Sequence, residues 1–328
     1  MTPASVAGGL VVALSGGIGG AKLALGLSRI LPAEELMIVA NTADDFCHLG
    51  LSISPDLDTL TYTLAGLNNL QTGWGRRDET WTFMTALREL GGEAWFQLGD
   101  GDLAIHVERT RRLAAGETLS QITADFCRRL GVRAKLVPMS DDSVRTRVRT
   151  NNGWLDFQDY FVRQRCQPAV LELAFEGWQA ARPQTELMAA LRNPGIRAVI
   201  ICPSNPFISI DPILAVPGLR QALGNSPAPV VAIAPIIGGR AVKGPTAKMM
   251  SELGLEVDAA TVARHYGGIL DGYVVDHGDV DQVALPGLPV HAAAILMQTL
   301  HDREALAHEA VAFADRLRAR GKKVWASA

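Results

Sequence analysis

The sequence lacks the features that would place it in several specialised classes of protein. Its four cysteines form no CxxC pair, so neither a disulfide framework nor a cysteine zinc site is indicated. The seven histidines show no HxH or HExxH spacing, which argues against a zinc enzyme. No apolar run approaches the ~20 residues that span a bilayer. The first apolar run is short and has no basic flank, unlike a signal peptide. We therefore expect a cytoplasmic protein without membrane association.

The charge balance carries no signature of a polyanionic partner. The formal net charge is −3, whereas nucleic-acid binding usually requires a basic patch. Hydrophobic residues make up 48% and charged residues 20% of the chain, as in ordinary globular proteins. At 328 residues the chain can bury an ample core, either as one large α/β domain or as two domains.

Short β-branched runs alternate with helical patterns along most of the chain. This alternation is typical of βαβ units and predicts an α/β fold, a Rossmann-like doubly wound and mostly parallel sheet. Ligands of such sheets bind beyond the carboxyl ends of the strands. The predicted strands are residues 9–14, 36–40, 198–202, 230–234 and 272–275.

Residues 60–130 show helical patterns and few strand signals. We predict that they form a mainly helical insertion that covers the active site, and that 1–59 and 131–328 form the nucleotide-binding core. Asn151-Asn152-Gly153 lies between two alternating segments and predicts a β-hairpin. Residues 302–320 are expected to form one amphipathic helix.

The first apolar run leads directly into a glycine loop. A buried strand that ends at glycines and a helix start offers free backbone N–H groups to an anion. Lys22 stands where the dinucleotide-binding fingerprint needs its third glycine, and the GK[ST] ending of a Walker A loop is missing. A tight turn without a ligand remains the alternative. The candidate phosphate-binding residues are Gly16, Gly17, Gly19, Gly20 and Lys22.

Four aspartates follow the second predicted strand: Asp44, Asp45, Asp56 and Asp58. Carboxylates beside a phosphate cradle suit Mg²⁺, which binds one or two carboxylates together with phosphate oxygens. The alternative is structural, because Asp56 or Asp58 can cap the next helix and Asp44 can be a turn residue. The sequence alone does not rank the four.

Further polar segments follow the later strands. Ser204 and Asn205 lie between two prolines and offer hydrogen bonds to phosphate, ribose or base, although they can equally cap the next helix. Lys243 and Lys248 flank a helix start and form either an anion site or a solvated basic face. The tryptophans are either core residues or platforms for a flat ring.

Taken together and in order, several segments resemble the 2-phospho-L-lactate transferase family of deazaflavin coenzyme biosynthesis. The resemblance runs from about Leu10 to about Asp276, and the combination of motifs is specific although each one alone is weak. The segments are Ser15–Lys22, Asn41–Asp45, Ser54–Thr59, Trp74-Gly75, Leu98–Asp102, Pro138–Asp142, Phe157–Asp159, Pro203–Pro206 and Pro235–Gly238.

The resemblance implies an Mg²⁺-dependent phosphotransferase of coenzyme F-420 biosynthesis. Such an enzyme moves a phospho-acid group from a GDP-activated donor to the ribityl hydroxyl of Fo (7,8-didemethyl-8-hydroxy-5-deazariboflavin), and GMP leaves. The acid of the donor is lactate, enolpyruvate or glycerate, and the sequence leaves this choice open. Both substrates are small molecules, and a homodimer is expected.

The resemblance also implies roles for individual residues. The glycine loop, Lys22, Ser204 and Asn205 hold the GDP moiety, and Asp44, Asp45, Asp56 and Asp58 include the metal ligands. Asp58 is favoured as the group that orients or deprotonates the attacking hydroxyl, with Asp45 as a second catalytic residue. Fo is expected near Asp58, Trp74 and Gln97. Gln97 occupies a position where the family often has a basic residue.

Two other functions are less consistent with the sequence. A non-catalytic nucleotide-sugar-binding regulator of the same superfamily should lack Trp74-Gly75 and the Leu98–Asp102 segment, both of which are present. An NAD-dependent dehydrogenase is disfavoured by the broken glycine fingerprint.

Overall fold

A seven-stranded parallel sheet forms the centre of the computed structural model, which describes residues 8–321. The sheet order is β5-β2-β1-β9-β10-β13-β14, and every neighbouring pair is parallel. The chain thus winds outwards from β1 first in one direction and then in the other, which confirms the Rossmann-like doubly wound fold. The strands are β1 (Val11–Ser15), β2 (Leu36–Ala40), β5 (Lys135–Pro138), β9 (Ala198–Ile201), β10 (Val230–Ile233), β13 (Gly272–Asp276) and β14 (Val290–Ala293).

The degree of burial explains which strands of the sheet could be predicted from the sequence. All residues of β1, β2, β9 and β10 are buried, so each reads as a continuous apolar run. The two strands of this sheet that we did not predict, β5 and β14, form its edges. β5 begins at the exposed Lys135, and β14 contains the half-buried His291. Short edge strands of mixed polarity give no clear apolar run.

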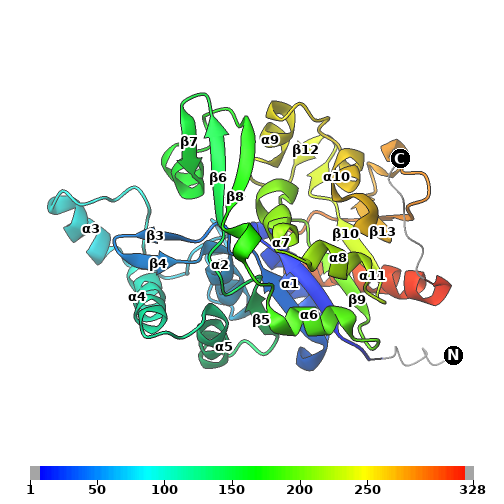
Figure 1. The fold of residues 1–328 in the computed structure, drawn as a ribbon, viewed down its shortest axis with the longest axis horizontal. Coiled ribbons are helices and arrows are strands. Elements are labelled where there is room, and N and C mark those ends of the chain that lie inside the picture. Colours follow the sequence, from blue (N-terminus) through cyan, green and yellow to red (C-terminus); the bar gives the residue numbers. More distant parts are fainter. Residues whose placement is uncertain (1–7, 322–328) are drawn as a thin grey trace.

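Helices cover both faces of the sheet (Figure 1). On one face α1 (Gly17–Ile30) packs against α2 (Pro55–Leu64) and α11 (Leu300–Arg320), and α11 also crosses four strands of the sheet. The right-handed crossover rule places the connections between β9, β10 and β13 on the opposite face. These connections contain α7 (Asp211–Ala215), α8 (Leu219–Gly224), α9 (Thr246–Glu252) and α10 (Ala259–Tyr266), and α6 (Thr185–Arg192) packs beside α8.

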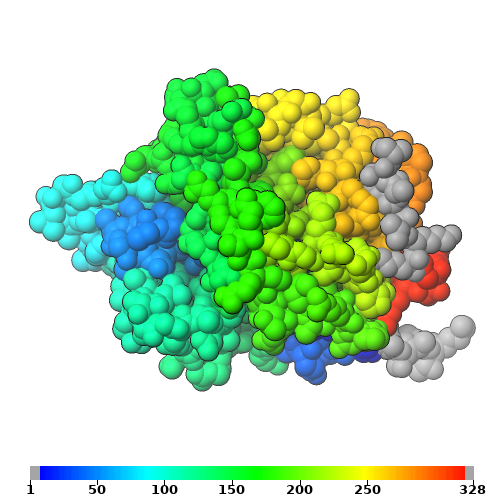
Figure 2. All heavy atoms as spheres, in the orientation of Figure 1, coloured from blue at the N-terminus to red at the C-terminus, as the bar shows by residue number. Residues whose placement is uncertain are grey.

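The helical segment between β2 and β5 has small cores of its own. It contains α3 (Thr82–Glu89), α4 (Asp100–Ala114) and α5 (Leu119–Arg129). A hairpin of β3 (Phe46–His48) and β4 (Leu51–Ile53) packs against α4, and Figure 2 shows it framed by these helices. The expected boundary after residue 59 lies inside α2, whose Leu57 and Leu60 belong to the main core. The two small cores are Tyr62, Ile105, Ile122 and Phe126, and Ile53, Met84 and Leu98.

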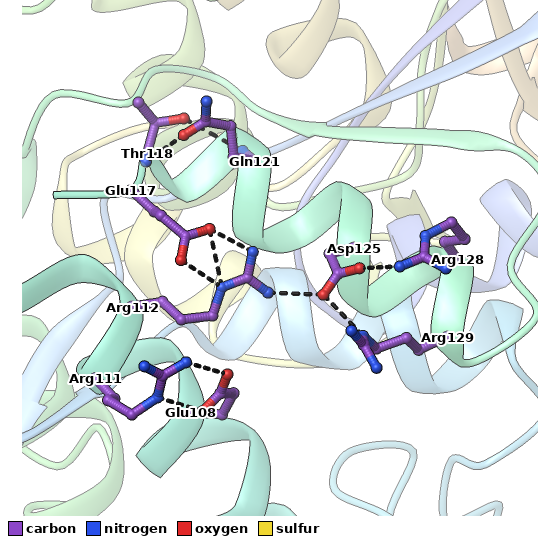
Figure 3. Close-up of polar contacts among 9 residues, drawn as sticks. All are labelled: Glu108, Arg111, Arg112, Glu117, Thr118, Gln121, Asp125, Arg128 and Arg129. Atoms are coloured by element: carbon purple, nitrogen blue, oxygen red, sulfur yellow. Dashed lines mark hydrogen bonds and ion pairs between the residues drawn. The ribbon is translucent and has the colours of Figure 1, made fainter. Parts of the chain in front are cut away.

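A network of ion pairs joins α4 to α5 (Figure 3). Arg112 on α4 donates to Glu117 at 2.5 Å and to Asp125 on α5 at 2.8 Å. Asp125 also accepts hydrogen bonds from Arg128 and Arg129. Single exposed pairs contribute little. Here Arg128 and Arg129 lie on α5 with Asp125, so the link between the two helices is the pair of Arg112 and Asp125. Because α5 packs on β5, the network anchors α4 to the sheet.

A second, antiparallel sheet rises above the carboxyl edge of the first (Figure 1). Its strands are β6 (Arg145–Thr150), β7 (Gly153–Asp156) and β8 (Glu172–Glu176), in the order β7-β6-β8. β6 and β7 pair from Thr150 and Gly153 outwards, which confirms the predicted hairpin. A short hairpin of β11 (Ile236–Ile237) and β12 (Arg240–Ala241) precedes α9. Within residues 8–321, no helix has the length and apolar character of a membrane span.

The packing of α1 on α11 yields a stability prediction. A Cβ on Gly26 would lie 2.1 Å from the carbonyl oxygen of Arg303, so Gly26→Ala forces the two helices apart. We expect the free energy of unfolding to fall by about 1–3 kcal/mol, as in other overpacked cores. Gly224→Ala is the matched control, because a Cβ there meets nothing within 4 Å. Urea denaturation of both variants checks this, and equal stabilities would contradict it.

Candidate active site at the carboxyl edge of the sheet

The sheet order reverses between β1 and β9, and the loops that follow these two strands are joined there. The hydroxyl of Ser204 accepts the N–H of Gly16 at 3.1 Å and donates to the carbonyl of Gly16 at 2.8 Å. The side-chain oxygen of Asn205 accepts the N–H groups of Phe207 (2.9 Å) and Ile208 (3.4 Å), which is the capping role considered from the sequence. This crevice is where open α/β sheets bind ligands.

Asp56 connects three segments at this crevice. One of its carboxylate oxygens accepts the N–H of Gly17 at 2.7 Å, and the other accepts the side-chain amide of Asn41 at 3.0 Å. The same amide also donates to the carbonyl of Ile208 at 3.3 Å. Asp56 lies in the first turn of α2, yet it caps the N-terminus of α1 rather than its own helix.

The glycines of the loop have two different roles. A Cβ on Gly16 would lie 2.6 Å from Ser209 Cβ, and one on Gly19 would lie 2.4 Å from the carbonyl oxygen of Pro203. A Cβ on Gly20 would lie 2.4 Å from Ser15 Oγ. Gly17 differs, since its φ is +64° and the space beside it is open. Three glycines therefore allow close packing, and Gly17 allows the sharp turn into α1.

Asp44 and Asp45 follow β2 and are buried. Asp44 accepts a hydrogen bond from the hydroxyl of Thr146 at 3.2 Å, and Asp45 accepts one from the hydroxyl of Ser54 at 2.7 Å. The second oxygen of Asp45, Oδ1, is buried and has no hydrogen-bond partner within the described residues.

The charges of these carboxylates are poorly compensated. Burial raises the pKa of Asp45 to about 7 and that of Asp56 to about 6. Burial, together with the charge of Asp56, raises the pKa of Asp44 well above its usual value. A divalent cation beside them would favour the ionised form of all three. Among the described residues these three are not a group whose ligand atoms all lie within 4.8 Å of one another, so an Mg²⁺ ion here would take one or two of them together with phosphate oxygens of a ligand.

Asp58 lies in a different environment from the other three aspartates. Both of its oxygens accept hydrogen bonds from the buried guanidinium of Arg109, one of them at 3.1 Å. Nδ1 of His106 is 3.7 Å from Asp58, and Nε2 of His106 is 3.1 Å from Asp102, to which the hydroxyl of Tyr62 also donates. Asp58, Asp102 and His106 offer ligand atoms within 4.8 Å of one another, a group that can hold a metal ion.

The sequence analysis did not identify Arg109 and His106. Asp102, His106 and Arg109 recur at intervals of four and three residues on α4, so they lie on one face of that helix. This helical spacing is the sequence signal that could have grouped these three residues. It did not show that the face meets α2, because Arg109 and Asp58 are 51 positions apart.

Lys22 is turned away from the aspartates. Its Nζ donates to the carbonyl of Met297 at 2.7 Å, in the segment before α11. Burial lowers the pKa of Lys22, and the neighbouring charges of Arg303 and Lys243 lower it further.

The two residues expected beside Fo lie in different loops. Trp74 is half exposed in the 68–76 loop, which the ammonium of Lys243 joins through the carbonyl of Thr72 at 2.8 Å. The amide oxygen of Gln97 accepts from Arg88 at 2.7 Å, and its amide nitrogen donates to the carbonyl of Ala94 at 2.8 Å.

An aromatic cluster that we did not predict lies next to Gln97 in sequence. The rings of Phe46 and Phe96 are 4.9 Å apart, and those of His48 and Trp95 are 5.0 Å apart. Phe46 directly follows Asp45, so this cluster begins where the acidic segment ends.

The pairing of Asp58 with Arg109 yields one prediction. Arg109→Met leaves a buried carboxylate without its cation, and we expect the free energy of unfolding at neutral pH to fall by about 3–5 kcal/mol. The double variant Asp58→Asn/Arg109→Met removes both charges and should recover most of this loss. Urea denaturation of the wild type, Asp58→Asn, Arg109→Met and the double variant gives the coupling energy between the two residues. A double variant no more stable than Arg109→Met would show that packing, not charge, is responsible.

The raised pKa values give a prediction on pH. Without metal, a carboxyl whose folded pKa is raised binds its proton more tightly in the folded than in the unfolded state. The contribution of these carboxyl groups to stability is therefore largest at acidic pH and falls as the pH rises from about 4 through about 7. Asp45→Asn should flatten this slope in EDTA, whereas Asp281→Asn, at an exposed position, should not. Saturating Mg²⁺ should raise the stability above pH 7. A slope that is identical in both variants would exclude Asp45 as its source.

Comparison with known proteins identifies the family of the chain. A family model described as 2-phospho-L-lactate transferase CofD matches residues 11–315. A phosphoenolpyruvate transferase of Streptomyces griseus is 39% identical over 318 residues, which covers 94% of this chain and 99% of the relative. The phosphoenolpyruvate transferase of Mycobacterium tuberculosis is 40% identical over 308 residues and covers 85% and 92% of the two chains.

A solved structure shares the fold at low sequence identity. The crystal structure of a UPF0052 family protein from Bacillus halodurans superposes with a TM-score of 0.62 at 15% identity, over 94% of this chain and 100% of that one. The family model spans both loops of the crevice and all four aspartates. The chain therefore belongs to the 2-phospho-L-lactate transferase family.

Proposed function

We propose that the protein transfers a phosphoenolpyruvyl group from a GDP-activated donor to the terminal ribityl hydroxyl of Fo, with release of GMP. As a member of its family, the chain is a phospho-acid transferase of coenzyme F-420 biosynthesis. Enolpyruvate is the acid that we favour over lactate and glycerate, because the similar relatives described above are phosphoenolpyruvate transferases. The observation that supports this function most strongly is the buried aspartate cluster that is hydrogen-bonded to the glycine loop.

The donor fits the crevice between β1 and β9. Its diphosphate would lie against the first turn of α1, where Asp56 is the one side chain among residues 8–321 that accepts a backbone N–H. Gly17, beside open space, would leave the start of the helix open to the diphosphate, while Gly16, Gly19 and Gly20 let the loop pack closely on its neighbours. Ser204 and Asn205 would form the opposite wall. Lys22 would reach the phosphates from the side of α11.

The reaction is a substitution at the phosphorus that carries the acid. The ribityl oxygen bonds to this phosphorus, the bond from phosphorus to the oxygen of GMP breaks, and the hydroxyl proton leaves to a base. We propose Asp45 as this base. Its pKa of about 7 suits proton transfer near neutral pH, and its Oδ1 is free to accept. Asp58, favoured from the sequence, has both oxygens on Arg109, so we assign it to positioning.

Mg²⁺ would supply charge neutralisation on the phosphates when bound. Asp44 would bind it together with phosphate oxygens of the donor, with Asp56 beside it, and Oδ1 of Asp45 would stay free for the proton. Asp58 lies at the margin because Arg109 already neutralises that carboxylate. The group of Asp58, Asp102 and His106 is a second place where a metal ion fits.

The acceptor would lie between the sheet edge and the helical segment of residues 60–130. The tricyclic ring of Fo needs a largely apolar slot with few polar anchors. The aromatic cluster of Phe46, His48, Trp95 and Phe96 offers such a wall close to Asp45 in sequence, and Trp74 offers a second exposed ring. Gln97 would contact the polar edge of the ring. A homodimer is part of this proposal, and light scattering tests it.

The test is a direct assay. The purified protein is incubated with Fo, Mg²⁺ and one GDP-activated acid (enolpyruvate, lactate or glycerate) in separate reactions. The molecular mass of the deazaflavin product is then measured by mass spectrometry. We expect turnover with the enolpyruvyl donor to exceed the other two, with one GMP per product. If no donor yields a phosphodiester of Fo, the proposed function is wrong. Preference for another donor would correct only the acid.

Replacement of the proposed base gives a sharper prediction. Asp45→Asn should lower kcat by about 10²–10⁴-fold, the usual contribution of a positioned base, while GDP affinity changes little. Asp281→Asn, at an exposed position, should retain wild-type kcat. Steady-state kinetics at several pH values measure this, because loss of the base also removes the rise of kcat/KM with pH. Near-normal turnover of Asp45→Asn would exclude Asp45 as the base.

A further inference from the structure

Three cationic side chains from distant parts of the chain converge beside α1. Lys22 lies on α1, Lys243 lies between β12 and α9, and Arg303 lies in the first turn of α11. The charges of Arg303 and Lys243 both act on Lys22. No carboxylate of the described residues lies within ion-pair distance (4.0 Å) of any of the three.

The hydrogen bonds of these cations leave most of their donors unused. Lys22 donates to the carbonyl of Met297 at 2.7 Å, and Lys243 donates to the carbonyl of Thr72 at 2.8 Å. Nε of Arg303 is buried and has no partner among the described residues. Each lysine has three N–H donors and an arginine has five, so the cluster has many donors and only neutral acceptors.

Nearby carboxylates are engaged elsewhere. Asp302 accepts the backbone N–H groups of Gln298 at 2.9 Å and Thr299 at 2.7 Å, as the N-terminal cap of α11. Glu304 pairs with Arg29 on the surface. Burial lowers the pKa of Arg303 and, with the two neighbouring cations, that of Lys22. The charge of Asp302 offsets part of this effect on both cations, but Asp302 forms an ion pair with neither of them among the described residues.

There is room for a ligand at this place. Lys22 and Arg303 line a small cavity of about 20 Å³ together with Ile18, Thr63 and Gly73. They also line an adjoining open groove of about 1330 Å³ between α1, α2 and the start of α11. A ligand can therefore reach both cations from the groove.

The cluster also borders the start of α1. A Cβ on Gly73 would lie 3.0 Å from Ile18 Cγ2 and 3.1 Å from Nζ of Lys243. Lys243 therefore stands beside the first turn of α1, the turn whose N–H groups follow the glycine loop. Lys243 and Arg303, which both lie outside the first βα unit, therefore approach the side of α1.

We infer that Lys22, Lys243 and Arg303 form a phosphate-binding site, and that its ligand is the diphosphate of the donor nucleotide. This identification of the ligand rests on the proposed function. Several cations without carboxylate partners match the multiple negative charge of a diphosphate. The planar guanidinium of Arg303 suits two phosphate oxygens at once. Lys243 also donates to the carbonyl of Thr72, so it would connect the 68–76 loop to the same ligand.

Isothermal calorimetry with GDP and with pyrophosphate, each without Mg²⁺, tests this site. Lys243→Met and Arg303→Met should each weaken binding of both ligands about tenfold or more. Lys243→Arg should restore most of the affinity. Arg29→Met is the matched control, since this exposed arginine lines the same groove but pairs with Glu304, and its affinities should equal the wild type. Because Arg303 packs near Gly26, its variant is first checked by thermal unfolding, and Lys243→Met, in an exposed loop, is free of that concern.

The possible outcomes separate this inference from the proposed function. Unchanged affinities in both methionine variants would overturn the site, as would failure of the wild-type protein to bind pyrophosphate. If pyrophosphate binds through these cations but GDP does not, the phosphate site stands and the nucleotide donor is wrong. If GDP binds with equal affinity in all variants, the donor stands and its diphosphate lies elsewhere.

Discussion

The carboxylate of Asp56 is the contact on which the rest of this site depends. A buried carboxylate is costly unless donors satisfy it, and here the donors are the first N–H of α1 and the amide of Asn41. These donors follow β1 and β2, while Asp56 itself begins α2. One side chain therefore sets the distance between the glycine loop and the acidic segment. A ligand that contacts both the glycine loop and the acidic segment is therefore positioned by the hydrogen bond from Gly17 to Asp56.

The four aspartates illustrate how environment assigns roles to identical groups. Asp56 is satisfied by amides and Asp58 by a guanidinium, so both are structurally committed. Asp45 retains an unpaired oxygen and a raised pKa, which are properties of a reactive or metal-binding carboxylate. A buried carboxylate with a raised pKa in a cleft is a candidate catalytic acid or base. Here the buried arginine of α4 is the feature that separates Asp58 from Asp45.

The sequence predicted what depends on local pattern and missed what depends on tertiary contact. The buried central strands and the β6–β7 hairpin were found because continuous apolar runs and the Asn-Gly turn are local signals. The edge strands β5 and β14 were missed because partial exposure mixes their composition. The aspartates were found as a group, but the partner of Asp58 lies on α4 and the partner of Lys22 lies before α11. No spacing rule reaches across such separations.

The packing of the C-terminal helix, α11, determines where one cation of the proposed phosphate site lies. Gly26 lets α11 approach α1 so closely that a methyl group would not fit, and this approach brings Arg303 next to Lys22. Two cations at such proximity repel each other, so packing energy of the helices holds an electrostatically unfavourable pair in place. In the proposed phosphate site, a bound anion would relieve this repulsion. The close helix contact thus provides binding energy for a ligand that neither helix would attract as strongly alone.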